Sequence, residues 1–511
     1  MTFSKENISE RLSRLPLLPL LVATIVGIVL AGRVSLPLWV LVVGVLVTAT
    51  ATWLWQRRAW GRIYLCVAVA LLAALSVELH RPAMVSGGTL LCDIEVEGIS
   101  SQGSSRSSGY GKIIATYRDT VATPCRIPIR ITADSAVALA MGTRLHAGCR
   151  LHPYSVRDTL SFNRYMARRG FVGGVWLKRG DILHCDTLTG IGHSVGRAAL
   201  ERLARLPLSA EAMATAAAVT LGRREMLSAQ TKEEYRRSGG AHLLAVSGLH
   251  VGFVYAIVGV LLGFLLLVRN GQLWRSILLV GIMWIYVAMV GFSPSVVRAA
   301  LMFSIMQIIV ALSASAFSLN TLFGAAMIIL WFSPQMLFDA GFLLSCLSVA
   351  AIVEWGVPLI FRIKTLIARG VEPQRTAWRG VVVYVLGWIV SAVVVSIVAS
   401  LATMPLVAHQ FGLTSLWGIV SGPLVVALCG VVVGVTLLWI ILPIGFLAPV
   451  VGWAVESAAS AMNSVAAWCA EREGLIFEGR ISLSACVVIY LFYIVATVVV
   501  WSRERKKLPN L

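Results

Sequence analysis

The sequence predicts a polytopic α-helical membrane protein of about twelve spans, with a small β domain inserted after the third span. The chain of 511 residues is 58% hydrophobic and only 13% charged, whereas soluble domains carry about 25% charged residues. Apolar runs of about 20 residues, the length that crosses a hydrocarbon core, recur along most of the chain. One polar stretch of about 100 residues interrupts them with strand-like alternation. The composition excludes a soluble globular enzyme and a disordered protein.

Residues 1–84 are predicted to cross the membrane three times, near residues 15–32, 36–55 and 60–79. The first run is not expected to be a cleavable signal peptide. Two further spans follow it, and no small-residue cleavage pattern lies between them.

Residues 85–190 are predicted to form the β domain, because strand-like runs such as LLCDIEVEGI and GKIIATY occur there. Residues 125–134 alternate strictly, which predicts a half-buried strand. The two faces of that strand are Ile127, Ile129 and Ile131 on one side and Arg126 and Arg130 on the other. Residues 191–240 are rich in arginine and are interpreted as an amphipathic helical connector.

Residues 241–511 are predicted to form a multi-span domain with a short basic tail. The run 446–469 contains Glu456 and Asn463, so a position on the membrane surface stays open for it. The predicted spans are 241–268, 276–291, 295–313, 320–332, 341–361, 380–405, 414–442, 446–469 and 481–501.

The placement of lysine and arginine predicts the topology in the cytoplasmic (inner) membrane, because basic loops stay on the cytoplasmic side. With the N-terminus inside, the β domain lies outside. Twelve crossings place the basic loop 362–379 and the C-terminal tail inside, whereas eleven do not, and this favours 446–469 as a span.

The predicted outer segment, residues 85–240, carries 21 Lys and Arg against 13 Asp and Glu, a net charge of 21 − 13 = +8. A polyanionic ligand arriving from outside would explain this charge, and a solvated basic surface is the alternative. An oxidising compartment permits disulfides in this segment, with buried free thiols as the alternative. Four cysteines allow three pairings: Cys92, Cys125, Cys149 and Cys185.

The most unusual stretch is HLLAVSGLH, residues 242–250, where two histidines, a serine and a glycine enter an apolar run together. On a helix Ser247 and His250 share a face, while His242 lies roughly 140° away from Ser247. A straight helix cannot aim all three at one point, and Gly248 offers a place to kink. Polar residues at this depth are costly, so they indicate a function, with helix–helix hydrogen bonding as the alternative.

Two further ionisable residues are predicted near the outer ends of their helices. Ser293 and Pro294 suit a helix start, which places Arg298 about one turn inside the span. A cation there opposes the helix dipole, so it needs a carboxylate, a phosphate or an escape to the headgroups. Asp339 precedes the next span. We predict that His242, Arg298 and Asp339 line the outer mouth of a polar pathway, and that Asp339 pairs with Arg298 or positions it.

The sequence predicts no metal, no cofactor and no enzymatic activity. It contains no HxH, HExxH or CxxC motif and no GxxxxGK[ST] nucleotide-binding motif.

Residues 242–252 (HLLAVSGLHVG) resemble the signature of the ComEC family, the inner-membrane DNA-uptake channel of natural transformation. Four other segments resemble family blocks in the same order along the chain. They are SFNRY at 161–165 with Gly170, GRREMLS at 222–228, the pattern PSxxRAxxM at 294–302, and the block from Asn320 to Ser345.

The resemblance implies an OB-like outer domain and a channel domain through which one DNA strand passes inward while the other is degraded. The outer domain would meet DNA through basic and aromatic residues, as OB-folds do: Tyr110, Tyr117, Arg118, Arg126 and Arg130. The DNA path would involve His242, Ser247, Gly248, His250, Arg298 and Asp339.

The resemblance also implies partners. Many members end in a metallo-β-lactamase-like domain, which this chain is expected to lack, so a separate nuclease is expected. A periplasmic DNA receptor, a cytoplasmic DNA motor and membrane lipids are expected as further partners, and a homo-oligomer stays open. Two other functions remain as alternatives: a permease for small anions or lipids, and an intramembrane Ser/His hydrolase built on Ser247 and His250.

Overall fold

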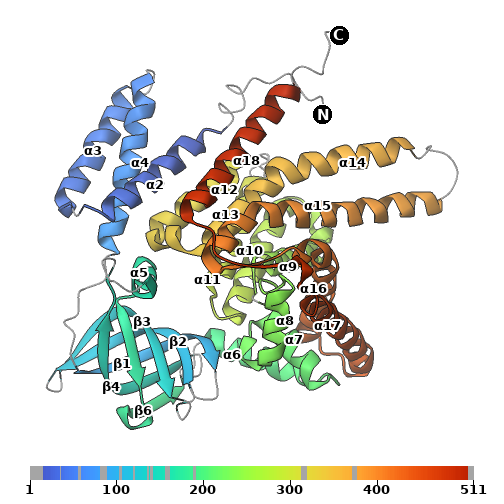
Figure 1. Ribbon diagram of the computed structural model, residues 1–511, viewed down its shortest axis with the longest axis horizontal. Coiled ribbons are helices and arrows are strands. Elements are labelled where there is room, and N and C mark those ends of the chain that lie inside the picture. Colours follow the sequence, from blue (N-terminus) through green and yellow to red (C-terminus); the bar gives the residue numbers. More distant parts are fainter. Residues whose placement is uncertain are drawn as a thin grey trace.

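The computed structural model combines a large helical bundle with a separate β unit (Figure 1). It describes residues 15–34, 36–55, 59–80, 89–102, 106–118, 121–134, 137, 142–155, 161–187, 191–244, 246–311, 319–370 and 377–504. The basic termini on which the predicted topology depends, residues 1–14 and 505–511, lie outside this part of the chain.

Three helices begin the described chain: α2 (Leu17–Ala31), α3 (Leu38–Leu54) and α4 (Ala59–Leu79). α3 presents large side chains to its surroundings, with Trp39 and Trp53 both 70% exposed. α2 and α4 pack against α12 (Leu319–Phe332) of the later bundle. The first three helices and the later bundle therefore form one helical body.

The β unit is a ring of five strands with a sixth strand added. The strands are β1 (Thr89–Gln102), β2 (Arg106–Arg118), β3 (Val121–Asp134), β4 (Thr143–Pro153), β5 (Gly173–Leu177) and β6 (Ile182–Thr187), and the helix α5 (Ser161–Arg168) lies between β4 and β5. The ring closes because β1 pairs with both β2 and β4, while β5 joins β3 to β4. Among the described strands of this unit, only β3 and β5 pair in parallel. β6 pairs with residues 143–147 of β4, whereas β5 pairs with residues 151–153 of the same strand.

The core of the β unit confirms the predicted alternation of β3. Ile127, Ile129 and Ile131 are at most 3% exposed and pack with the inward residues of the other strands. Arg126 is exposed and Arg130 is half-buried on the opposite face.

Three helices connect the β unit to the rest of the bundle: α6 (Ile191–Leu203), α7 (Ala210–Leu221) and α8 (Ala229–Arg237). The prediction of an amphipathic connector fails for α7, which is buried over nearly its whole length within the main core. Alanine and threonine make α7 narrow and leave it without a continuous polar face, so α16 (Trp417–Ile441) and α17 (Ala448–Ala470) pack closely against it.

The remaining helices complete the bundle: α9 (Gly248–Leu261), α10 (Gly271–Met289), α11 (Pro294–Ala311), α13 (Ala340–Ala351), α14 (Val357–Gly370), α15 (Ala377–Phe411) and α18 (Leu483–Glu504). A short turn, η4 (Pro334–Phe338), separates α12 from α13. α14 and α15 extend together away from the bundle (Figure 1). The strands β7 (Leu413–Ser415) and β8 (Ile476–Glu478) pair beside the bundle.

Each of the twelve predicted spans contains a helix, and among the described residues seven segments are long and apolar enough to cross a membrane. These are Trp60–Leu79, Gly248–Leu267, Gly271–Met289, Ala340–Ile367, Ile389–Phe411, Trp417–Ile441 and Gly445–Ala470. The last has the length and composition of a span, and whether 446–469 crosses the membrane stays a prediction. The protein is a membrane protein; the total of twelve crossings stays a prediction.

Two polar residues of α17, Glu456 and Asn463, contact the connector. Asn463 bonds to Thr215 and Glu211 of α7 and accepts a hydrogen bond from Tyr235 of α8, 3.0 Å from its oxygen. Glu456 accepts from the backbone N–H and the hydroxyl of Ser209, at 2.9 and 2.8 Å. Hydrogen bonds to the connector satisfy the polar side chains of Glu456 and Asn463, so α17 can carry them although it is otherwise largely apolar.

Candidate functional site

The stretch that contains the two histidines lies between α8 and α9, and α9 begins only at Gly248. The predicted kink at Gly248 is therefore wrong, because the residues before it are not helical. Ser247 has extended backbone angles and forms the N-cap of α9. Residue 245 lies outside the described part of the chain.

His250 is fully buried and acts at the start of α9. The backbone N–H of Ser247 donates to His250 Nδ1 at 3.1 Å, and the Ser247 hydroxyl lies at the same distance from that atom. Since Nδ1 accepts a backbone hydrogen bond, the ring hydrogen is on Nε2, which faces Cys429 Sγ of α16 at 3.4 Å. His250 thus takes the place that Glu or Gln holds in a capping box, and ties α9 to α16.

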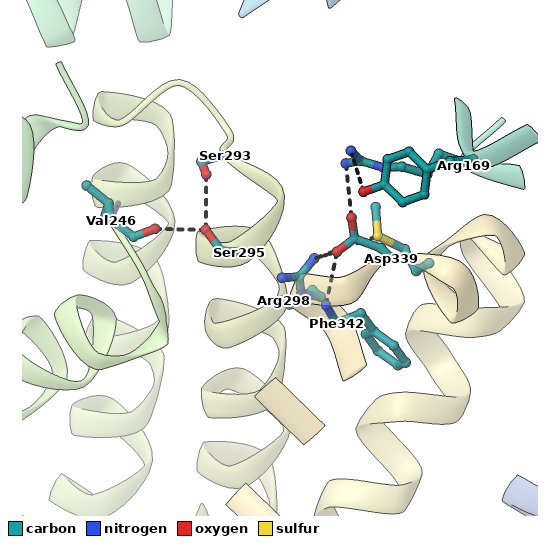
Figure 2. Close-up of polar contacts among 9 residues, drawn as sticks. Arg169, Val246, Ser293, Ser295, Arg298, Asp339 and Phe342 are labelled. Atoms are coloured by element: carbon teal, nitrogen blue, oxygen red, sulfur yellow. Dashed lines mark hydrogen bonds and ion pairs between the residues drawn. The ribbon is translucent and has the colours of Figure 1, made fainter. Parts of the chain in front are cut away.

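Side chains from two other segments satisfy the backbone carbonyls of this non-helical stretch. Arg224 Nε donates to the Leu244 carbonyl at 3.1 Å, and the Ser295 hydroxyl donates to the Val246 carbonyl at 2.8 Å (Figure 2). Backbone groups inside a membrane domain require such partners, since water is scarce there. Three segments that are distant in the sequence therefore meet at the start of α9.

Arg298 and Asp339 form the predicted ion pair (Figure 2). Arg298 is 5% exposed, and its Nη1 lies 3.3 Å from Asp339 Oδ1. The same oxygen accepts the backbone N–H of Phe342 at 3.0 Å, so Asp339 is also the N-cap of α13. A Cβ at Gly341 would lie 3.0 Å from Arg298 Nη2, so the glycine leaves room for the guanidinium.

Arg169 of the β unit binds the other oxygen of the same carboxylate, a contact that the sequence analysis missed. Its Nη2 lies 2.9 Å from Asp339 Oδ2. Beside it Gly170 has φ +85°, and a Cβ there would lie 2.9 Å from Gln335 Cγ of η4. The β unit is thus joined to the bundle by an ion pair and by the close approach of Gly170 to the Gln335 side chain. A signal was present in the sequence, since Arg169 and Gly170 end the segment that begins with SFNRY.

α11 connects the two clusters, because Ser295 and Arg298 lie one turn apart on it. His242 is not part of either cluster: it is exposed, and its Nδ1 lies 3.1 Å from the Gly239 carbonyl. A Cβ at Gly248 would lie 3.5 Å from the Ala299 Cβ, so α9 and α11 are packed at this point. With His250 0% and Arg298 5% exposed, neither side chain faces an open path in this conformation. The roles of these residues in a DNA path stay predictions.

The predicted DNA contacts of the β unit fall into different surroundings. Tyr110 of β2 is the cross-strand neighbour of Arg130, whose guanidinium lies 4.7 Å from the Phe162 ring centroid. Tyr117 donates to Asp93 Oδ2 at 3.0 Å, a bond that raises the pKa of the phenol. Arg126 lines a cavity of about 640 Å³ together with acidic and basic neighbours. The side chain of Arg118 lies outside the described residues.

Two of the four cysteines of the β unit lie side by side. Cys92 Sγ and Cys149 Sγ, on the adjacent strands β1 and β4, are 2.7 Å apart in the core, and all four cysteines are thiols. The contact with Cys149 and burial raise the pKa of the Cys92 thiol. Cys125 donates to the Ile113 carbonyl and Cys185 is exposed. The geometry selects Cys92 and Cys149 as the pair suited to a bond.

Together, the apolar helices and the carboxylate shared between two arginines define a multi-helix membrane protein with a β unit docked on its bundle. The chain belongs to the competence protein family, since the model of that family matches residues 219–504, more than half of its length. It is 26% identical over 302 residues to ComE operon protein 3 of Bacillus subtilis (strain 168). That match covers 58% of this chain and 35% of the relative, so the chain spans about a third of the relative's length. No solved structure matches the chain.

These comparisons confirm the resemblance to ComEC-type proteins that the sequence analysis stated. The matched residues include the stretch before α9, the start of α11 and Asp339, whereas Arg169 lies outside them.

Proposed function

We propose that the protein acts in competence, as the path by which a single strand of DNA crosses the cytoplasmic membrane. Family membership supports the role in DNA uptake. One observation carries the proposal: three segments of the family region meet where a non-helical stretch enters the bundle, beside a buried arginine. Irregular backbone and a buried cation are costly inside a membrane and are characteristic of transport sites.

The proposed path must handle one negative charge per nucleotide across about 30 Å of hydrocarbon. Arg169 and Arg298 share the single carboxylate of Asp339, which leaves a net charge of +1 at this place. The described conformation is closed at His250 and Arg298, so passage of a strand requires the carbonyls of Leu244 and Val246 to leave Arg224 and Ser295. Hydrogen bonds from side chains to a backbone suit such a movement, because water or a phosphate can replace them.

The proposal includes an OB-like outer domain and cytoplasmic termini. The strand order β1-β2-β3-β5-β4, closed by β1 pairing with β4, supports the OB-like assignment. A cytoplasmic motor would pull the strand, a periplasmic receptor would deliver the DNA, and a separate nuclease would remove the other strand.

The proposal assigns no catalysis to this chain. Ser247 Oγ lies within hydrogen-bond distance of His250, as a Ser/His hydrolase requires. However, His250 Nδ1 already accepts a backbone N–H, and Nε2 faces Cys429 rather than a carboxylate. A base held in this way helps to start a helix and is poorly placed to take a proton from substrate.

The test is a deletion strain supplied with end-labelled double-stranded DNA. We expect label to become resistant to external nuclease in the periplasm, while none reaches the cytoplasm and transformants disappear; the intact gene restores both. Transformation at the normal frequency in the deletion strain would exclude the function.

A further inference from the structure

One of the two side chains that hold the non-helical stretch before α9 lies on a turn that the β unit contacts. Arg224, which holds the Leu244 carbonyl, begins the turn η2 (Arg224–Met226), and β1 lies against this turn. Tyr110 of β2 is half-buried nearby: burial raises the pKa of its phenol, while Arg169 and Arg224 are close enough to lower it. Arg224 therefore lies where the β unit meets the bundle.

The other holding side chain is linked to the β unit through two ion pairs (Figure 2). Ser295, which holds the Val246 carbonyl, lies on α11 one turn before Arg298. Arg298 Nη1 lies 3.3 Å from Asp339 Oδ1, and Arg169 Nη2 of the β unit lies 2.9 Å from the second oxygen of the same carboxylate. Both side chains that close the entrance thus depend on elements against which the β unit is docked.

The contact made by the β unit is the weaker of the two ion pairs. The side chain of Arg169 is 34% exposed, whereas that of Arg298 is 6% exposed. A partly exposed ion pair contributes little to stability and water can replace it, while a buried pair is costly to separate. The β unit can therefore leave Asp339 while Arg298 keeps its partner. Undocking is the easier of the two movements.

We propose that the docking of the β unit controls the entrance of the membrane path. In the docked state η2 and the start of α11 are held in place, so Arg224 and Ser295 stay within hydrogen-bond distance of their carbonyls. Such bonds weaken steeply once donor and acceptor move apart, so a small shift of either element releases the stretch. By reciprocity, whatever favours the undocked β unit also favours the open entrance. This inference rests on the proposed function, since it regulates the same path.

A buried thiol behind the stretch reports whether the entrance is open. Cys429 of α16 is 0% exposed, and its Sγ lies 3.4 Å from His250 Nε2. The other nitrogen of this ring accepts the backbone N–H of Ser247, so a movement of the stretch uncovers the histidine and the thiol together. Cys469 of α17 is 1% exposed and does not contact the stretch, so it serves as the internal control.

The experiment measures how fast each thiol of the full chain reacts with the water-soluble anion 2-sulfonatoethyl methanethiosulfonate. The protein is held in phosphatidylcholine nanodiscs, and peptide mass spectrometry identifies the modified cysteines. We expect Arg169→Gln to raise the rate at Cys429 by about 1.5- to 5-fold, because it removes a partly exposed ion pair, and to leave Cys469 unchanged. Arg169→Lys keeps the charge and should react like the wild type. The matched control is Arg150→Gln, an exposed arginine of β4.

A double variant tests whether the β unit acts through the holding side chains. Ser295→Ala removes one hold directly and should raise the rate at Cys429 by itself. In that background Arg169→Gln should have a smaller effect than in the wild type, because part of what it acts on is already lost.

Three results would overturn control by docking. Cys429 could react at the wild-type rate in Arg169→Gln, Cys469 could rise in parallel with Cys429, or the effects of Arg169→Gln and Ser295→Ala could multiply independently. The proposed function is judged separately by transformation. If the deletion strain transforms normally while Arg169→Gln exposes Cys429 selectively, control by docking stands and the uptake role falls. If the deletion strain loses transformation while Arg169→Gln leaves Cys429 protected, the uptake role stands and control by docking falls.

Discussion

Replacing Asp339 removes the carboxylate that two arginines share and tests whether it joins the β unit to the bundle. The side chains of Arg298 and Asp339 are 6% and 16% exposed, and that of Arg169 is 34% exposed. Removing one partner of a buried ion pair costs about 3–5 kcal/mol, because the other charge stays buried without compensation. Removing a helix N-cap adds about 1 kcal/mol.

We therefore expect Asp339→Ala to destabilise the protein by about 4–6 kcal/mol. Asp339→Asn should cost about 1 kcal/mol less, since asparagine is also a good N-cap and loses only the charge. Arg169→Gln should cost at most about 1 kcal/mol, because its ion pair is partly exposed. Removing both buried charges, in Arg298→Met with Asp339→Asn, should be less harmful than Asp339→Asn alone.

The assay is the free energy of unfolding of the purified protein during titration with SDS in mixed micelles, read from tryptophan fluorescence. Glu225→Gln is the matched control, because this carboxylate lies 3.8 Å from Arg223 in a looser ion pair. Two outcomes contradict the reasoning: an effect of Asp339→Asn no larger than that of Arg169→Gln, or a double variant whose loss equals the sum of the two single losses.

Three further predictions concern other contacts. If the β unit lies in an oxidising compartment, mass spectrometry without reductant should find Cys92 joined to Cys149, and a Cys125–Cys185 peptide would contradict the geometry. His250→Gln should retain most stability, because an amide oxygen can accept the Ser247 N–H, whereas His250→Leu should lose about 1–3 kcal/mol; equal losses would reject the capping role. The hydrogen bond to Asp93 raises the pKa of Tyr117 in the folded protein. This bond should therefore contribute fully to stability below about pH 10, and its contribution should disappear as the pH rises through the raised pKa. Tyr117→Phe should abolish that pH dependence in thermal unfolding, and an unchanged profile would count against it.

Much of the fold follows from local patterns in the sequence. Apolar length predicts where helices lie, and alternation predicts which face of β3 is buried, because both depend on residues close in the chain. The prediction that residues 191–240 form an amphipathic connector fails at α7, because the burial of this helix depends on residues that are distant in the chain. Its alanines have no periodic polar face, and only packing against α16 and α17 explains their burial.

For the candidate site, too, the sequence predicted some residues and not others. The Arg298–Asp339 pair was predictable, because each residue is an isolated charge at the end of an apolar run and needs a partner. Arg169 ends the segment that begins with SFNRY, but it is one of 43 basic residues, and only the docking of the β unit shows that Asp339 is its partner. The turn at Ser247 was read as a kink because periodicity does not reveal that a histidine can replace Glu in a capping box.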